Sequence, residues 1–306
     1  MASYYLMMDI GGTGVKAGIL DGQGKLCGGI QRFDARAKES AEVIFSNFAW
    51  IIEQMGERFL EPGDVFCGIG MAFPGPFDYA GGISLMKGLD KYDAIYGMDL
   101  RKEVLKRVTK TRLPEEKEKC PFLFLHDVEA FALGESSFGA AAESRRIFCL
   151  CIGTGAGSAF VENGEILKYG ENIPAEGWIY AMPYRESIID DYISARGLQN
   201  VAKQHLGKEL TGAELSELAG GKNEDALKSF EEFGTDVLTA VQPFLESFCP
   251  DGVVIGGQIA KSFSYFGTAL EQFCRDKNIR VYVTAETSER TLEGLYTGFA
   301  RAKEKR

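Results

Sequence analysis

Two stretches of the chain show nearly the same order of apolar, glycine and polar positions. Each has an apolar run, a glycine-rich turn, a second apolar run and then an Asp-Gly or Asn-Gly pair; the first covers Asp9 to Gly22 and the second Cys151 to Gly164. Asp-Gly and Asn-Gly pairs between apolar runs favour two-residue hairpins. The pattern therefore predicts two equivalent halves, with the glycine turns in register.

The glycine turns are Gly11-Gly12-Thr13-Gly14 and Gly153-Thr154-Gly155. Glycine lets the backbone approach a ligand, and bare N–H groups in a turn form a concavity suited to phosphate oxygens. Two such turns could hold one polyphosphate, although glycine hairpins are often only structural. Residues 12–17 also fit the dinucleotide pattern G-x-G-x-x-A, but that pattern must open a helix, whereas Asp21-Gly22 predicts a hairpin here.

The rest of the chain alternates short apolar runs with helical periodicity, which predicts an α/β fold. We expect helices at 39–59, 99–110, 129–138, 188–206 and 225–247, strands at 65–72, 122–125, 252–255 and 280–283, and a charged connection at 114–119. We assign residues 1–120 to an N-terminal domain and 121–287 to a C-terminal domain. A C-terminal helix at about 288–306 is expected to pack back on the first domain.

Composition favours small-molecule chemistry. A chain of 306 residues with 45% apolar content is long enough for two domains, and its net charge of −10 argues against nucleic acid and anionic membranes as partners. No apolar run approaches the roughly 20 residues of a membrane span, and no signal peptide is recognisable. Seven scattered cysteines suit a reducing compartment, and only two histidines are present to complete a Cys/His zinc site. The cytoplasm is the expected location.

Three side chains could carry phosphoryl transfer, which needs a phosphate cradle, Mg²⁺ and a base. Asp9 ends a predicted strand before the first turn, where it could hold Mg²⁺ through water or simply bond turn amides. Lys16 could reach phosphate or lie on the hairpin surface. Asp127 follows a buried strand and precedes a helix, so it is the candidate base, with helix capping as the alternative.

Two further turns follow predicted buried strands. Pro74-Gly75-Pro76 breaks regular structure after the strand at 65–72, and Gly256-Gly257 follows the strand at 252–255. Ligands of open α/β sheets bind beyond the carboxyl ends of the strands. Both turns are therefore candidate ligand contacts.

Together these residues resemble the ROK family of sugar kinases and repressors, within the actin and hexokinase superfamily. The resemblance extends over nearly the whole chain in the family's order. It covers the first glycine turn with Lys16, Pro74-Gly75, residues 127–135 around Asp127, the second glycine turn, residues 191–196 and Gly256-Gly257.

The resemblance implies two actin-like (ribonuclease H-like) α/β domains with a cleft between them, often in a homodimer. It implies ATP- and Mg²⁺-dependent phosphorylation of a hexose hydroxyl with Asp127 as general base. The implied nucleotide-binding residues are Gly11, Gly12, Thr13, Lys16, Gly153, Thr154, Gly155, Gly256 and Gly257. The implied sugar-binding residues are Pro74, Gly75, His126, Asp127 and Glu176.

The chain departs from the family pattern at several positions. His126 replaces the asparagine before the catalytic aspartate, Gly88 replaces an asparagine in the loop after Pro74-Gly75, and Trp178 replaces the histidine of the Glu-x-Gly-His element. The cysteine cluster that follows this element in many members is missing, so no structural zinc is expected. These departures fall on the sugar side, so a phosphate-donor site is better supported than any particular acceptor.

Several functions compete with a glucokinase-like activity. A ROK repressor would carry an N-terminal helix-turn-helix, but the strand that leads to the first glycine turn already starts by residue 4. The acidic charge also disfavours DNA as a partner. A catalytically weakened sugar-binding or regulatory protein would fit the altered sugar side. Fructose, mannose or an N-acetylhexosamine could replace glucose as acceptor, and polyphosphate could replace ATP as donor.

Overall fold

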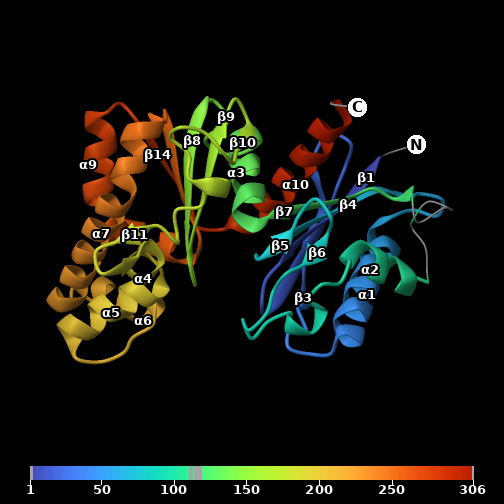
Figure 1. Ribbon diagram of the computed structural model, residues 1–306, viewed down its shortest axis with the longest axis horizontal. Helices are drawn as coiled ribbons and strands as arrows, with labels where there is room; N and C mark the ends of the chain where they lie inside the picture. The colour runs from blue at the N-terminus through green and yellow to red at the C-terminus, as the bar shows by residue number, and fades with distance from the viewer. Residues whose placement is uncertain (1–2, 110–112, 114–118, 305–306) are drawn as a thin grey trace. The chain divides into compact units, whose positions relative to one another are not determined.

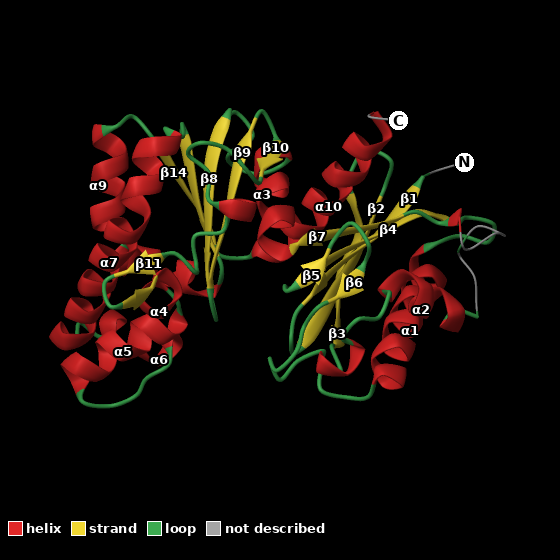
Figure 2. Ribbon diagram, in the orientation of Figure 1, coloured by secondary structure: helices red, strands yellow, loops and turns green. Residues whose placement is uncertain are grey.

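The computed structural model describes residues 3–109, 113 and 119–304 (Figure 1). The chain divides into two compact units, residues 1–137 with 288–306 and residues 138–287. Each unit is built around a five-stranded sheet of its own (Figure 2). The charged connection expected at 114–119 lies outside the described residues except for Lys119.

The first unit contains a mixed sheet in the order β3-β2-β1-β4-β7. Its strands are β1 (Tyr4–Ile10), β2 (Gly14–Leu20), β3 (Leu26–Asp34), β4 (Phe66–Phe73) and β7 (Phe122–His126). The strands β1, β4 and β7 run parallel, and β2 and β3 form an antiparallel meander. The carboxyl ends of the three parallel strands therefore lie at one edge of the sheet, where ligands of such sheets bind.

Helices cover both faces of this sheet. Successive residues of a strand point to opposite faces. Leu6 and Met8 of β1 belong to the core shared with α1 (Ala41–Phe59) and α2 (Leu100–Arg107), whereas Tyr5 and Met7 pack with residues of α10 (Thr287–Glu304). The helix α1 begins at the predicted place because Ser40 caps it, accepting a hydrogen bond from the Val43 N–H.

The helix α10 crosses α3 (Asp127–Ser137) at contact distance between the two backbones. A Cβ built on Gly134 would lie 1.8 Å from the carbonyl oxygen of Arg290, and one built on Gly294 would lie 1.7 Å from that of Ala130. No side chain fits at either position. The two glycines therefore fix the spacing of the helix that begins with Asp127 and the C-terminal helix.

Gly294→Ala should lower the free energy of unfolding by about 1–3 kcal/mol, because the methyl group meets backbone that cannot move without separating the helices. Chemical denaturation measures the change. Gly298→Ala, one turn further along α10, is the matched control, since its Cβ would meet the end of the Leu123 side chain at 2.7 Å. A cost at Gly294 no larger than at Gly298 would contradict the close crossing.

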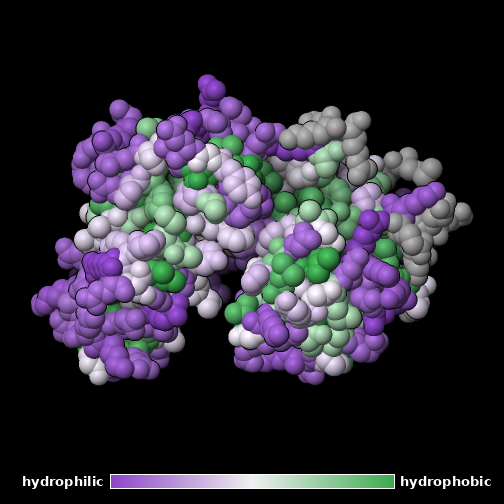
Figure 3. All heavy atoms as spheres, viewed as in Figure 1, coloured by the Kyte–Doolittle hydropathy of each residue, from purple (hydrophilic) through white to green (hydrophobic). Residues whose placement is uncertain are grey.

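A short hairpin follows β4 at the edge of the first sheet where the parallel strands end. The strands β5 (Phe77–Asp78) and β6 (Ile83–Ser84) follow Pro74-Gly75 and were not predicted. Leu85 and Leu89, just beyond β6, are 43% and 45% exposed. Figure 3 shows apolar residues on the surface over β5 and β6. This part of the unit therefore presents apolar as well as polar groups to solvent.

The second unit repeats the same sheet. Its strands follow the order β10-β9-β8-β13-β14, which matches the first sheet strand by strand in position and direction. They are β8 (Arg146–Ile152), β9 (Ala156–Glu162), β10 (Glu165–Leu167), β13 (Gly252–Gly256) and β14 (Arg280–Thr284). The predicted duplication is thus present in the topology.

The helices of the second unit pack mainly into one core with this sheet. They are α4 (Ile189–Ile193), α5 (Ala195–Leu206), α6 (Gly212–Gly220), α7 (Glu224–Phe248), α8 (Phe263–Phe266) and α9 (Thr268–Asp276). The single helix predicted at 188–206 is two helices, because Ser194 is extended between α4 and α5. The helices α6, α8 and α9 were not predicted. Among the described residues, no helix is both long and apolar enough to cross a membrane.

The division between the units differs from the expected boundary at residue 120. Residues 121–137 belong with the first unit, because β7 pairs with β4 and its His126 is in register with Phe73. The division falls after Ser137, at the end of α3. Residues 288–304 of α10 lie in the first unit, as the sequence predicted for the C-terminal helix.

Candidate functional site

The first glycine turn presents two free backbone donors. It consists of four residues, Gly11 to Gly14, between the paired residues Ile10 and Val15. The Gly11 N–H donates to the Gly14 carbonyl at 2.9 Å, whereas the N–H groups of Gly12 and Thr13 donate to no group in the described part of the chain. Gly12 and Thr13 are exposed. The turn can therefore donate two hydrogen bonds to an anion.

The second glycine turn has the same character but is one residue shorter. Three residues, Gly153 to Gly155, lie between the paired Ile152 and Ala156. Gly153 donates to the Gly155 carbonyl at 2.9 Å, and within residues 119–304 the N–H groups of Thr154 and Gly155 have no acceptor. The two turns are thus not in the exact register that the sequence repeat predicts, although each offers two donors.

The second turn is held by the segment that begins α4. Asp190 accepts a hydrogen bond from the Ala156 N–H at 2.7 Å and from Arg196 at 2.7 Å. Ala195 donates its N–H to the Gly153 carbonyl at 2.8 Å, which explains why the helix is interrupted at Ser194. Residues 191–196 match a family segment in the sequence, but Asp190 was not predicted, because its partner at the turn, Ala156, is 34 residues away.

Asp190→Ala should weaken nucleotide binding about tenfold, which corresponds to about 1.4 kcal/mol, because the residue that follows the turn, Ala156, loses its hydrogen bond to the Asp190 side chain. Calorimetric titration with ATP measures the effect. Asp191→Ala is the matched control, since Asp191 also lies near Arg196 (3.3 Å) but makes no contact with the turn. Equal effects of the two variants would rule out the bracing role.

The Gly256-Gly257 turn lies beside the second glycine turn. Gly256 ends β13 in register with Cys151 of β8. Gly257 has a φ of 91°, and a Cβ there would lie 2.4 Å from the carbonyl oxygen of Ile152, the residue before Gly153. The four glycines Gly153, Gly155, Gly256 and Gly257 therefore occupy one edge of the second sheet. These predicted nucleotide-binding residues are brought together within one unit.

The corresponding edge of the first sheet gathers the other candidates. Asp9 is level with Ala72 of β4, which is level with Leu125 of β7. The chain then leaves these strands at Pro74-Gly75 and at Asp127. A Cβ on Gly75 would lie 3.7 Å from Cδ2 of His126, so the two predicted sugar-side segments are in contact.

Asp127 has one carboxylate oxygen engaged and one available. Its Oδ1 accepts the Val128 N–H at 2.8 Å and lies 3.1 Å from Nδ1 of His126. No group of the described chain hydrogen-bonds to Oδ2, and the side chain is 44% exposed. A carboxylate held in this way has a defined orientation and a free acceptor, which is what a general base requires.

Asp9 and Lys16 face each other across β1 and β2. The Lys16 ammonium lies 3.4 Å from Oδ2 of Asp9 and donates to the Ser288 hydroxyl at 2.7 Å. Burial raises the pKa of Asp9; Lys16 opposes the increase, and the negative charge of Asp127 adds to it. Ser288, at the start of α10, was not predicted, since no local signal connects it with a hairpin 272 residues away.

The carboxylates of Asp9 and Asp127 provide a test of whether Mg²⁺ fits the first unit. The negative charge of Asp127 adds to the electrostatic cost of ionising Asp9, whose side chain is 17% exposed. A divalent cation nearby would offset that cost, and Mg²⁺ bound largely through water needs few protein ligands. Among the described residues no group of three or more potential ligands occurs. The residues present therefore suit a water-mediated ion at Asp9 rather than an all-protein cage.

Asp9→Asn should stabilise the protein at neutral pH by a few degrees of melting temperature. A carboxyl group whose pKa is raised in the folded state binds protons more readily there than in the unfolded chain, so its ionisation costs stability as the pH rises. The gain should shrink as the pH falls through the raised pKa and vanish below the ordinary value of 3.8. Thermal unfolding across this range measures it.

Asp21→Asn is the control for this prediction. The Asp21 carboxylate accepts the N–H groups of Gln23 and Lys25 at the hairpin tip, so its neutralisation should give no stabilisation. If Asp9→Asn is destabilising at neutral pH, the carboxylate of Asp9 is not under electrostatic strain.

Glu176 belongs to the second unit, whereas the other predicted sugar-side residues belong to the first. It lies in the short helix η3 (Ala175–Gly177) with a φ of 58°. Tyr169 donates a hydrogen bond to Glu176, and the Lys168 ammonium lies 3.5 Å from its Oε2. The carboxylate is thus oriented by two side chains of its own unit.

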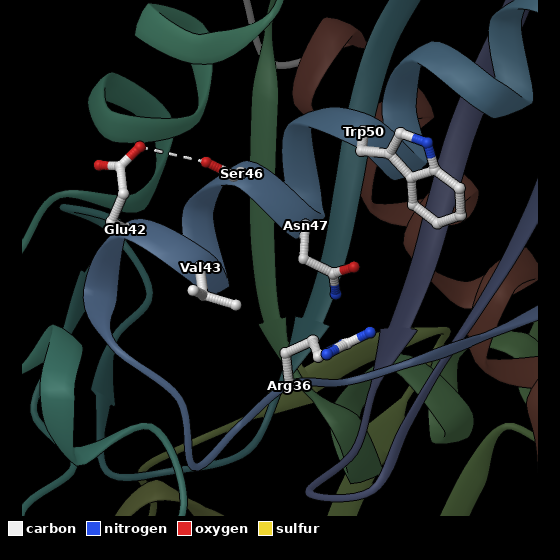
Figure 4. A pocket seen from close by; sticks show the side chains of 6 residues that line it. All are labelled: Arg36, Glu42, Val43, Ser46, Asn47 and Trp50. Carbon is white, nitrogen blue, oxygen red and sulfur yellow. Dashed lines mark hydrogen bonds between the residues drawn. The ribbon is translucent and has the colours of Figure 1, made fainter.

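A depression of about 420 Å³ lies on the surface of α1, and none of the predicted site residues lines it. Figure 4 shows its lining residues, Arg36, Glu42, Val43, Ser46, Asn47 and Trp50. The hollow is open, and Trp50 is 49% exposed within it. It is separate from the chemical groups described above, so it does not help to define the candidate site.

The model of the ROK family matches residues 5–289. The chain belongs to the ROK family. A glucokinase from Thermotoga maritima is 24% identical over 83% of this chain and 82% of its own length. A β-glucoside kinase from Listeria innocua is 25% identical over 94% of this chain and 93% of its own length.

The fold also agrees with that of solved ROK proteins. The structure of a ROK glucokinase from Streptomyces griseus, in complex with glucose and AMPPNP, superposes with a TM-score of 0.71 at 19% identity. The match covers 96% of this chain and 98% of that one. The two units are therefore the actin-like α/β units that the sequence predicted for a ROK protein.

Proposed function

We propose that the protein is an ATP-dependent sugar kinase that transfers the terminal phosphoryl group of ATP to a hexose hydroxyl. The observation that carries this proposal is the free Oδ2 of Asp127 at the sheet edge that also holds the first glycine turn, Asp9 and Lys16. The relatives named glucokinase and β-glucoside kinase, and the ROK glucokinase solved with glucose and AMPPNP, support it.

The phosphates of the nucleotide are assigned to the free N–H groups of the two turns. Gly12 and Thr13 donate in the first unit, next to Lys16, and Thr154 and Gly155 donate in the second unit. Gly256-Gly257 is assigned to the adenosine side, beside the second turn. Backbone donors are well suited to this task because they are already oriented before the ligand arrives.

Asp127 acts on the sugar. Its Oδ2 accepts the proton of the attacking hydroxyl while the new oxygen–phosphorus bond forms and the bond to the bridging oxygen of ADP breaks. The Val128 N–H keeps Oδ1 fixed during this step. Mg²⁺, held through water by Asp9, would neutralise the charge on the phosphate oxygens.

Pro74, Gly75, His126 and Glu176 are assigned to the sugar. The Tyr79 ring packs edge-on against His126 with a centroid distance of 6.0 Å, and its hydroxyl donates to the Phe73 carbonyl at 3.0 Å. His126 is thus supported from the loop that follows Pro74-Gly75. The choice among glucose, fructose, mannose, an N-acetylhexosamine and a glucoside as acceptor is assigned to these residues.

A weakened sugar-binding or regulatory ROK protein is the second candidate, because Gly88, His126 and Trp178 depart from the family pattern. For either candidate we expect a homodimer in the cytoplasm. ADP release measured with a panel of hexoses and N-acetylhexosamines separates the two, and ATP and polyphosphate are compared as donors in the same assay. Nucleotide binding without sugar-stimulated turnover by any sugar would overturn the kinase proposal.

Asp127→Asn should lower turnover by about 10²–10⁴-fold, because the amide cannot accept the hydroxyl proton. The affinity for ATP should stay nearly unchanged, since Asp127 makes no hydrogen bond with the first glycine turn in the described part of its unit. Steady-state kinetics and calorimetric titration measure the two effects. Turnover close to that of the unmodified enzyme would remove Asp127 from the role of base.

A further inference from the structure

The Lys91 side chain runs beside the first glycine turn. A Cβ built on Gly12 would lie 3.3 Å from Cδ and 4.0 Å from Cβ of Lys91. The alkyl chain of Lys91 therefore occupies the space beside Gly12, and its ammonium is only two covalent bonds beyond Cδ. Gly12 is the residue whose N–H, together with that of Thr13, has no acceptor within the described residues.

The neighbouring residue fixes Lys91 in this place. Tyr92 is fully buried, and its hydroxyl donates to the Gly11 carbonyl at 2.9 Å. Its N–H donates to the Ala37 carbonyl at 2.6 Å, and its ring packs against Phe48 and Phe73. Because Tyr92 is bonded to the turn itself, Lys91 keeps its position relative to that turn.

The Lys91 charge has no counterpart in the described chain. Nearby Lys38 pairs with Asp90, and Lys16 lies 3.4 Å from Asp9, but Lys91 forms no ion pair with any described residue. A lysine side chain that runs beside a turn with two free backbone donors is suited to binding an anion. Within the described residues, Lys16 is thus paired with a carboxylate near this turn, whereas Lys91 is not.

The segment that carries Lys91 continues from the part of the chain that the proposed function assigns to the sugar. It lies between β6 and α2, beyond the hairpin that follows Pro74-Gly75. During the reaction the terminal phosphoryl group of ATP must lie close to both the first glycine turn and the acceptor hydroxyl. The α-phosphate, which is attached to adenosine, does not have to approach the acceptor.

We propose that Lys91 is a catalytic residue that binds the terminal phosphate of ATP and the phosphoryl group during transfer. The inference rests on the proposed kinase function and adds a residue to it. A fixed ammonium stabilises the charge that the oxygens carry in the transition state, and it costs no rearrangement at that moment. ADP, which lacks the terminal phosphate, gains nothing from this side chain.

The test compares the affinities of Lys91→Met for ATP and ADP, in the absence of sugar, by calorimetric titration. Methionine keeps most of the alkyl chain beside Gly12 and removes the charge. We expect ATP to bind about tenfold more weakly and ADP with unchanged affinity, while turnover falls by about 10²-fold. Lys91→Arg, which keeps the charge, should restore most of the preference for ATP.

Lys87→Met is the matched control. Lys87 is on the same segment, but its ammonium lies over the Tyr96 ring at 5.4 Å from the centroid, so its loss should change neither affinity. An unchanged ratio of ATP to ADP affinity in Lys91→Met would overturn the inference. The proposed function fails differently: the unmodified protein would then show no sugar-stimulated ADP release, whatever the ratio of affinities.

Discussion

The backbone contact between α3 and α10 is the constraint on which the arrangement of the candidate site in the first unit depends. The helix α3 begins with Asp127, and Ser288, in the first turn of α10, holds Lys16 beside Asp9. Because Gly134 and Gly294 leave no room for a side chain, the two helices have one spacing. Asp127 and the charged pair of Asp9 and Lys16 are therefore positioned by one close helix crossing rather than by independent loops.

The first sheet supplies the other half of that positioning. Parallel pairing of β1, β4 and β7 brings the ends of three segments to one edge, although they are far apart in sequence. Buried strands tolerate little displacement, because a shift in register would turn apolar side chains to the wrong face. The backbone position of a polar residue directly after such a strand, such as Asp127, is thus fixed by the packing of the core.

Much of the fold and of the candidate site could be predicted from the sequence, and the features that were missed have physical causes. The glycine turns, the strands that flank them and Asp127 are local patterns, and the sequence located all of them. The interruption at Ser194 was missed because a tertiary hydrogen bond, from Ala195 to Gly153, overrides the helical periodicity. Tyr92, Asp190 and Ser288 were missed for the same reason: each acts through a partner that is distant along the chain.

The raised pKa of Asp9 couples ligand binding to the stability of the fold. Burial and a second carboxylate make the Asp9 charge costly, and Lys16 offsets only part of that cost, because the net shift of the pKa is upward. A cation bound close to this carboxylate would remove more of the cost, so its binding would raise the free energy of unfolding.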